Sequence, residues 1–199
     1  MPGLRPAPQG LRPLARELSD GVPILTTLQI VGSVLAAALL FWVVGAYNRL
    51  VRLRGAIVRR FVPVDEQFRQ RHALLLQQIE ALAPVLANAA PRLDALRAAC
   101  RQVEAACAHA KVRPGATGAI TSLRLADEIL GEARARLPVQ NVPGIDLAGL
   151  NAQLAASDAT LAFARRQFND AVATYNHAVQ QFPTALIIGL FGFRSAGAL

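Results

Sequence analysis

Residues 22–47 read VPILTTLQIVGSVLAAALLFWVVGAY, and no charged residue occurs between Gly21 and Asn48. A helix needs about 20 apolar residues to cross the hydrocarbon core of a bilayer, so this run can span it with some tilt. Trp42 and Tyr47 lie near the end of the run, where amphipathic aromatic rings favour the membrane interface. The run therefore predicts a transmembrane helix.

Two other interpretations of this run are a buried core helix and a cleaved signal peptide. A signal peptide has an apolar core of about 7–15 residues, shorter than this run. Twenty residues also precede the run, so retention as an anchor is the favoured interpretation. Residues 1–20 contain four prolines and two glycines, which predicts a flexible N-terminal tail.

The composition favours an all-α fold for the rest of the chain. The 199 residues are 53% hydrophobic and 17% charged, with mean hydropathy +0.33, which excludes a disordered polyelectrolyte. Aromatic residues make up only 6%, and helix formers outnumber the residues that strands favour. The expected architecture is a transmembrane helix followed by an antiparallel bundle of long helices over residues 48–183.

The net charge of +8 is concentrated directly after the apolar run. Residues 49–71 contain seven arginines and two acids, whereas residues 72–199 contain 11 basic and nine acidic side chains. This distribution favours contact with anionic lipid headgroups over nucleic acid, which needs basic residues across the folded surface. It also predicts a cytoplasmic bundle. The arginines predicted to face lipid are Arg49, Arg52, Arg54, Arg59 and Arg60.

A hydrophobic seam with alternating spacings of four and three runs through residues 68–110. Its members are apolar except for one histidine: Phe68, His72, Leu75, Ile79, Leu82, Leu86, Ala89, Leu93, Leu96, Cys100, Val103, Cys107 and Ala110. Such a seam predicts one long helix in a left-handed bundle. Pro84 and Pro91 each remove a backbone hydrogen bond, so we expect bends there.

Two further amphipathic segments follow, separated by loops at 112–118 and 138–144. The first has expected core positions Ile120, Leu123, Leu130 and Leu137. Asp146 is placed to cap the second, which Pro183 ends. The seam of the second segment comprises Leu147, Leu150, Leu154, Asp158, Leu161, Arg165, Phe168, Val172, Tyr175, Val179 and Phe182.

Candidate contact residues lie on this last seam and in the apolar tail of residues 184–199. Asp158 and Arg165 indicate either a face open to solvent or a buried polar pair that fixes helix register. The tail could fold back on the bundle, enter the membrane interface or meet a partner. The predicted partner contacts are Asp158, Arg165, Phe191 and Phe193.

No sequence motif indicates catalysis, a cofactor or a metal site. GxxxxGK[ST], GxSxG, HExxH and CxxC are absent, and the three histidines lie far apart. About 10 Å of helix separates Cys100 from Cys107, which is too far for a disulfide between them. Because both lie on the apolar seam, they are expected to be buried, inert thiols. Asp127, Glu128 and Glu132 are expected to form a solvated helix face.

Two blocks of residues form a recognisable pattern. The first is Tyr47-Asn48-x-Leu50-Val51-x-Leu53-Arg54 with Asp65, Gln67, Arg69 and Arg71. The second is Ala164-Arg165-x-x-Phe168-Asn169-Asp170-x-Val172, Tyr175-Asn176, Phe182-Pro183 and Leu190-Phe191-Gly192-Phe193. This pattern, over most of residues 47–193, resembles the bacterial LemA family. The resemblance implies a single-pass bacterial membrane protein with a helical-bundle domain, and it supplies no catalytic residue. The expected location is the bacterial inner (cytoplasmic) membrane.

Together these features predict a non-enzymatic, membrane-anchored scaffold or adaptor for membrane or envelope proteins. The alternative is a self-assembling structural protein that organises anionic lipid at the membrane surface. The expected partners are anionic headgroups and either further copies of the chain or other membrane proteins. Neither nucleic acid nor a small-molecule substrate is expected.

Overall fold

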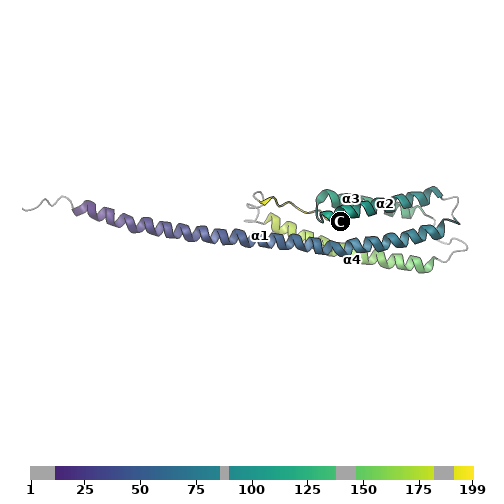
Figure 1. Cartoon of the computed structure of the whole chain (residues 1–199). Coiled ribbons are helices and arrows are strands. Elements are labelled where there is room, and N and C mark those ends of the chain that lie inside the picture. Colours follow the sequence, from purple (N-terminus) through teal and green to yellow (C-terminus); the bar gives the residue numbers. More distant parts are fainter. Residues whose placement is uncertain (1–11, 86–89, 138–146, 182–190) are drawn as a thin grey trace, which may run out of the picture. The chain divides into compact units, whose positions relative to one another are not determined.

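The computed structural model describes residues 12–85, 90–137, 147–181 and 191–199, with side-chain burial from residue 26 onward. Four helices make up this part of the chain: α1 (Arg12–Leu82), α2 (Ala90–Val112), α3 (Thr117–Ala135) and α4 (Ala148–Gln180) (Figure 1). No strand occurs in the described ranges, so the all-α prediction is confirmed. The chain divides into two compact units, Met1–Asn48 and Arg49–Leu199.

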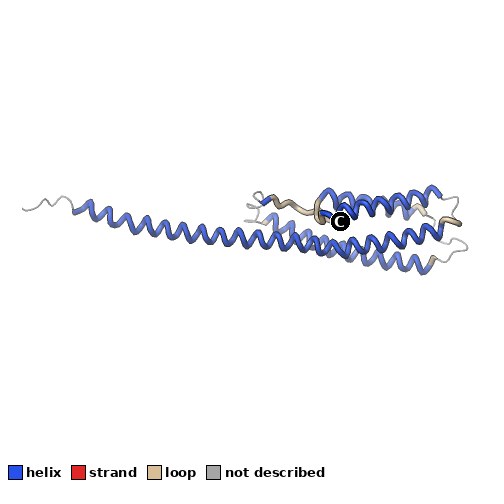
Figure 2. The backbone as a smooth tube through the Cα atoms, viewed as in Figure 1, coloured by secondary structure: helices blue, strands red, loops and turns tan. Residues whose placement is uncertain are grey.

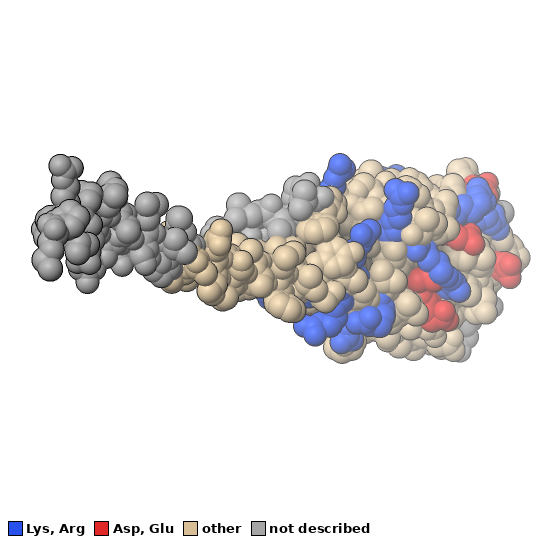
Figure 3. All heavy atoms as spheres, turned by 60° about the vertical axis from the view of Figure 1, so that its left-hand side comes forward, with Lys and Arg blue, Asp and Glu red and all other residues tan. Residues whose placement is uncertain are grey.

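The first unit exposes its apolar side chains. From Leu28 to Val44 the large hydrophobic residues of α1 are mostly exposed, and Phe41 is 80% exposed. The face shown in Figure 3 carries no charged side chain on the described part of this unit. The most apolar 18-residue window of α1 has mean hydropathy 2.2 and no buried residue. By length and composition this helix is a possible membrane span, and it lacks the burial of a core helix.

α1 begins earlier than the proline and glycine content of the N-terminal residues suggested. It starts at Arg12, so residues 12–20, expected in a flexible tail, are helical. Pro13 lies in the first turn, where a missing N–H costs no helical hydrogen bond. The rest of the predicted tail, residues 1–11, lies outside the described residues.

The second unit is a bundle of four helical segments, formed by the C-terminal part of α1 with α2, α3 and α4 (Figure 2). α1 and α2 are antiparallel, because Asp65 contacts Lys111 while His72 lies near Glu104. α3 and α4 are also antiparallel, because Asp127 pairs with Arg165 while Arg134, later on α3, pairs with Asp158, earlier on α4. The turn from α2 to α3 contains Gly115 with φ of 95°, a conformation that favours glycine.

The seam through residues 68–110 belongs to two helices, so the prediction of one long helix is wrong. α1 ends at Leu82 and residues 83–85 form a turn, because Pro84 has no N–H to continue the helix. Pro91 then lies in the first turn of α2, a position where proline is tolerated. The prolines therefore separate two antiparallel helices instead of bending one.

The core receives side chains from all four helices. The described seam members are buried, apart from half-buried His72, Leu150, Asp158 and Arg165. The four core positions expected for α3 and the residues after it are buried, which confirms them. Leu86, Ala89, the 138–144 loop, the Asp146 cap, Phe182 and Pro183 lie outside the described residues. On α1, three polar residues are also buried: Asp65, Arg71 and Gln78.

Candidate functional site

Five charged side chains from three helices form an ion-pair network inside the bundle, which we call the Arg71 network. Arg71 of α1 donates to Asp127 of α3, and its Nη1 lies 3.4 Å from Oδ1 of Asp158 on α4. Asp127 also accepts a hydrogen bond from Arg165 Nη2 of α4 at 2.5 Å. Arg134 Nη1 of α3 lies 3.0 Å from Asp158 Oδ2. The network therefore joins α1, α3 and α4.

Phe68 lies against two cations of this network. The guanidinium carbons of Arg71 and Arg165 lie 5.2 and 5.1 Å from the centre of the Phe68 ring, within cation–π range. Burial by itself would raise the pKa of the Asp127 carboxyl, but Arg71 and Arg165 hold that pKa below its usual value. Asp127 is thus an ionised structural acceptor rather than a proton donor.

Three expectations about charged residues can be compared with this arrangement. Asp158 and Arg165 are half-buried, and each forms ion pairs with side chains of other helices instead of with the other. A role in fixing helix register stays a prediction. Glu128 and Glu132 are exposed, as expected for a solvated face. The same expectation for Asp127 is wrong, because Asp127 turns toward Arg71 and Arg165.

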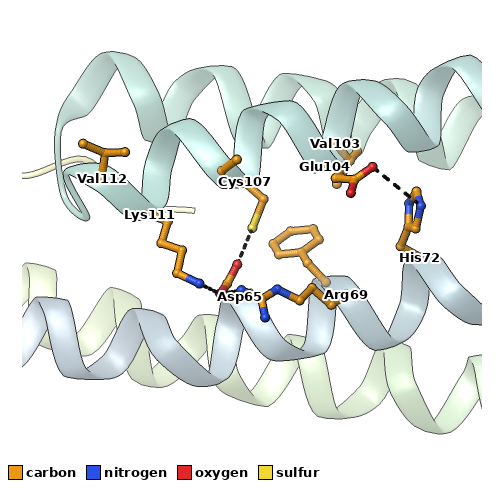
Figure 4. Close-up of a pocket in the computed structure, with 10 residues that line it drawn as sticks. Asp65, Arg69, His72, Val103, Glu104, Cys107, Lys111 and Val112 are labelled. Atoms are coloured by element: carbon orange, nitrogen blue, oxygen red, sulfur yellow. Dashed lines mark hydrogen bonds and ion pairs between the residues drawn. The ribbon is translucent and has the colours of Figure 1, made fainter.

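A cavity of about 490 Å³ lies between α1 and α2. Its apolar lining comes from Phe68, Val103, Ala108 and Val112, and its polar lining from Asp65, Arg69, His72, Glu104, Cys107 and Lys111. Figure 4 shows the α1 side chains pointing toward those of α2 across the cavity. The cavity thus combines an apolar interior with charged groups of both signs.

Asp65 is the most heavily engaged polar group of the cavity. It accepts from Lys111 Nζ at 2.9 Å, from Arg69 Nη2 at 2.6 Å and from Cys107 Sγ at 3.4 Å. Burial would raise the pKa of Asp65, but bonds from Lys111 and Cys107 and the charge of Arg69 lower it below the usual value. Asp65 is therefore an ionised and poor general base. Its neighbour Glu66 is exposed.

The two cysteines are buried free thiols, which confirms the expectation from sequence. Burial raises the pKa of Cys100. Burial and the adjacent Asp65 raise the pKa of Cys107 to about 12. A thiol with so high a pKa is protonated at neutral pH and is a poor nucleophile or metal ligand. In the described ranges no group of three or more His, Cys, Asp or Glu residues could hold a metal ion.

The family-pattern residues near the end of α4 bind the last described segment of the chain. Asn169, Tyr175 and Asn176 form hydrogen bonds with main-chain atoms of residues 194–199. This part of the apolar tail therefore folds back on the bundle, one of the three outcomes considered. Phe191 is exposed and Phe193 is buried, while residues 184–190 of the tail lie outside the described residues.

The remaining predicted site residues lie at the start of the second unit or next to it. The five arginines expected to face lipid are all exposed, and Arg60 also donates to Gln167 of α4. Tyr47 and Asn48 are exposed at the end of the first unit. Contact of these arginines with lipid, and of Asp158, Arg165, Phe191 and Phe193 with a partner, stays a prediction.

Residues 61–199, more than half of the chain, match the family model described as the LemA family. The match includes the Arg71 network, the α1–α2 cavity and the α4 residues that hold the 194–199 segment. A search of curated proteins gave no match.

Proposed function

The chain belongs to the LemA family, and we propose that it is a membrane-anchored, non-enzymatic scaffold or adaptor for other membrane proteins. In this proposal α1 holds the chain in the bacterial inner membrane and the helical bundle recruits the partner. The partner inserts an apolar side chain into the cavity between α1 and α2. The excess of arginine after the apolar run favours a cytoplasmic bundle.

The exposed apolar surface of α1 supports the anchor. Water-exposed side chains such as Leu35, Leu40 and Phe41 would leave a large apolar patch in contact with solvent, which soluble proteins rarely have. A bilayer would remove this surface from water. In this proposal the exposed arginines that follow along α1 contact the lipid headgroups.

The chemistry of the α1–α2 cavity carries the adaptor proposal. One of its two carboxylates, Asp65, is ionised and already bonded to three groups, and its thiol, Cys107, is protonated. These groups are unsuited to acid–base or nucleophilic catalysis at neutral pH. The apolar walls formed by Phe68, Val103 and Val112 still offer a favourable site for an apolar side chain. The states of Asp65 and Cys107 together with these apolar walls thus support a binding role for the cavity.

Site-specific photocrosslinking in cells tests this proposal. Val112 lines the cavity and is 76% exposed, so a photoreactive residue at this position should crosslink to one membrane protein. Substituting Ala108→Trp should fill the cavity and lower that yield by about tenfold, which corresponds to about 1.4 kcal/mol of lost binding.

The matched control is Ala95→Trp, an exposed position on α2 that does not line the cavity. This variant should leave the crosslink unchanged. A crosslink that survives Ala108→Trp, or one that both tryptophans weaken equally, would show that the cavity does not hold the partner. Circular dichroism of each variant checks that α2 keeps its helical structure.

The exposed arginines favour a second candidate function, organisation of anionic lipid by the bundle. Each arginine near an anionic surface gains about 1 kcal/mol, so five should hold the bundle firmly at low salt. Replacing Arg49, Arg52, Arg54, Arg59 and Arg60 with Gln in the Arg49–Leu199 unit should therefore weaken binding to anionic vesicles by at least about tenfold. Vesicle flotation at increasing salt measures this binding.

The control for this experiment changes the same number of charges elsewhere on the bundle. The exposed arginines chosen for it are Arg92, Arg101, Arg113, Arg124 and Arg166. Their replacement with Gln should affect flotation much less. Equal losses for both sets would indicate a response to net charge alone, and no loss for either would exclude the lipid-organising function.

A further inference from the structure

The charged groups that line the α1–α2 cavity are separated by sign along its length. One end carries Arg69 and Lys111, which both donate to Asp65, at 2.6 and 2.9 Å. The other end carries Glu104, whose Oε2 lies 3.8 Å from His72 Nε2. Figure 4 shows these two groups at different points along the facing sides of α1 and α2. The cavity therefore has a cationic end and an acidic end.

The cationic end has more hydrogen-bond donors than the carboxylate of Asp65 uses. The side chains of Arg69 and Lys111 are 56% and 55% exposed, whereas that of Asp65 is only 12% exposed. Guanidinium and ammonium groups carry several N–H donors each, and Asp65 accepts one bond from either side chain. Glu66 lies 4.0 Å from Arg69 but does not line the cavity. The remaining donors at this end can therefore bind a second carboxylate.

The acidic end presents a carboxylate to solvent. The Glu104 side chain is 69% exposed, and its ion-pair partner His72 is charged only when it is protonated. Within the described ranges, no Arg or Lys side chain forms an ion pair with Glu104. A cation from another molecule can therefore approach Glu104 from solvent.

The two ends are spaced as residues on a helix are. Glu104, Ala108 and Lys111 are exposed, line the cavity and follow one another along α2 at spacings of four and three. Seven residues of helix separate Glu104 from Lys111, a rise of about 10.5 Å. A second helix laid against this strip, antiparallel to α2, presents its residues i, i+3 and i+7 at the same spacings.

We propose that the partner binds this cavity through an amphipathic helix with an acidic residue at i, an apolar residue at i+3 and a basic residue at i+7. The acidic residue binds Arg69 and Lys111 at the cationic end. The apolar side chain enters the cavity beside Ala108, and the basic residue binds Glu104. The charges of the cavity thus fix which end of the partner helix lies at which end of the cavity.

Charge complementarity distinguishes this occupant from other segments. A segment with charges of one sign would meet repulsion at one end of the cavity. An uncharged segment would displace water from Glu104 and Lys111 without replacing its hydrogen bonds, which costs free energy. The inference rests on the adaptor proposal, to which it adds the chemistry and the orientation of the partner.

Photocrosslinking of the purified full-length protein to synthetic peptides tests the charge pattern. The protein carries a photoreactive residue at position 112, and the three alanine-rich peptides have about 18 residues, enough for partial helix formation. They carry Glu–Leu–Lys, Glu–Leu–Glu or Lys–Leu–Lys at i, i+3 and i+7. The Glu–Leu–Lys peptide should crosslink about fivefold more than either other peptide, because each of those replaces one attractive ion pair with a repulsive one. High salt should reduce this preference.

Matched substitutions show whether the preference comes from the cavity. Glu104→Lys, at an exposed position, should reverse it, so that the Glu–Leu–Glu peptide crosslinks about fivefold more than Glu–Leu–Lys. Asp94→Lys changes the net charge by the same amount at an exposed α2 position outside the cavity lining, and it should leave the preference for Glu–Leu–Lys unchanged. A response to the net charge of +8 alone would instead favour Glu–Leu–Glu in the unsubstituted protein.

Three results with the peptides would overturn the inference: no crosslink to any of them, no preference for Glu–Leu–Lys, or a preference that Glu104→Lys and Asp94→Lys alter equally. The cellular crosslink from position 112 separates this inference from the adaptor proposal. If Ala108→Trp abolishes that crosslink and Glu104→Lys leaves it at full yield, the adaptor proposal stands and the charge pattern is wrong. If the peptides show the expected preference but no membrane protein is crosslinked in cells, the charge pattern stands and the adaptor proposal is wrong.

Discussion

Replacing Arg71 with Met should lower the free energy of unfolding of the Arg49–Leu199 unit by about 3–5 kcal/mol. The Arg71 side chain is only 9% exposed, and it pairs with Asp127 and Asp158 on two other helices. Its loss leaves Asp127 inside the bundle with Arg165 as its remaining charged partner. Urea denaturation followed by circular dichroism measures the change.

Arg69→Met is the matched control for this prediction. Arg69 lies on the same helix and pairs with Asp65, but its side chain is 56% exposed, so its loss should cost less than about 1 kcal/mol. Adding Asp127→Leu to Arg71→Met should recover part of the loss, because the carboxylate left without Arg71 is removed. Equal costs for Arg69→Met and Arg71→Met would contradict a structural role for the network.

Replacing Phe168 with Ala should destabilise the same unit by a similar amount, about 3–5 kcal/mol. Phe168 is fully buried, and its ring meets that of Phe61 edge to face, with centres 5.7 Å apart and planes at 67°. The substitution removes apolar contact between α1 and α4 and leaves a cavity that the surrounding helices fill only in part. The midpoint of urea denaturation should therefore fall to a lower concentration.

Phe163 provides the control on the same helix. It is 56% exposed, so Phe163→Ala should change the free energy of unfolding by less than about 0.5 kcal/mol. A double-mutant cycle with Phe61→Leu and Phe168→Leu should give a coupling of about 0.5–1.5 kcal/mol for the aromatic pair. A cost for Phe168→Ala no greater than that for Phe163→Ala would contradict the packing described here.

Part of the Arg71 network could be predicted from the spacing of residues on the third helix. On the third helix, Ile120, Leu123, Asp127, Leu130 and Arg134 follow spacings of three and four, and Leu137 continues the pattern. These spacings place Asp127 and Arg134 on the same face as the buried leucines, so the signal for a buried Asp127 is present. Its side chain was nevertheless expected in solvent, because charged residues are rarely buried without partners and the partners lie on other helices.

The spacing of apolar residues also led to the wrong prediction of one long helix over residues 68–110. Leu75, Ile79 and Leu82 of α1 and Leu93 and Leu96 of α2 share one phase, although the chain reverses between them. A periodic pattern reports which side of a helix faces the core, but it does not record a reversal that happens to preserve its phase. Pro84 marked the position correctly, and only the packed helices distinguish a bend from a turn.

The sequence by itself determined the all-α fold, the apolar run of α1, the arginines that follow it and most core positions. These features depend on local composition and on helical periodicity, which neighbouring residues specify together. The tertiary structure alone decided that Arg71 meets Asp127 and Asp158, that Asp65 meets Lys111, and that α4 binds residues 194–199. Such contacts join residues far apart in the chain, so they form only when the helices pack. Packing buries these charged groups, and burial is costly unless each is paired with a group of opposite charge.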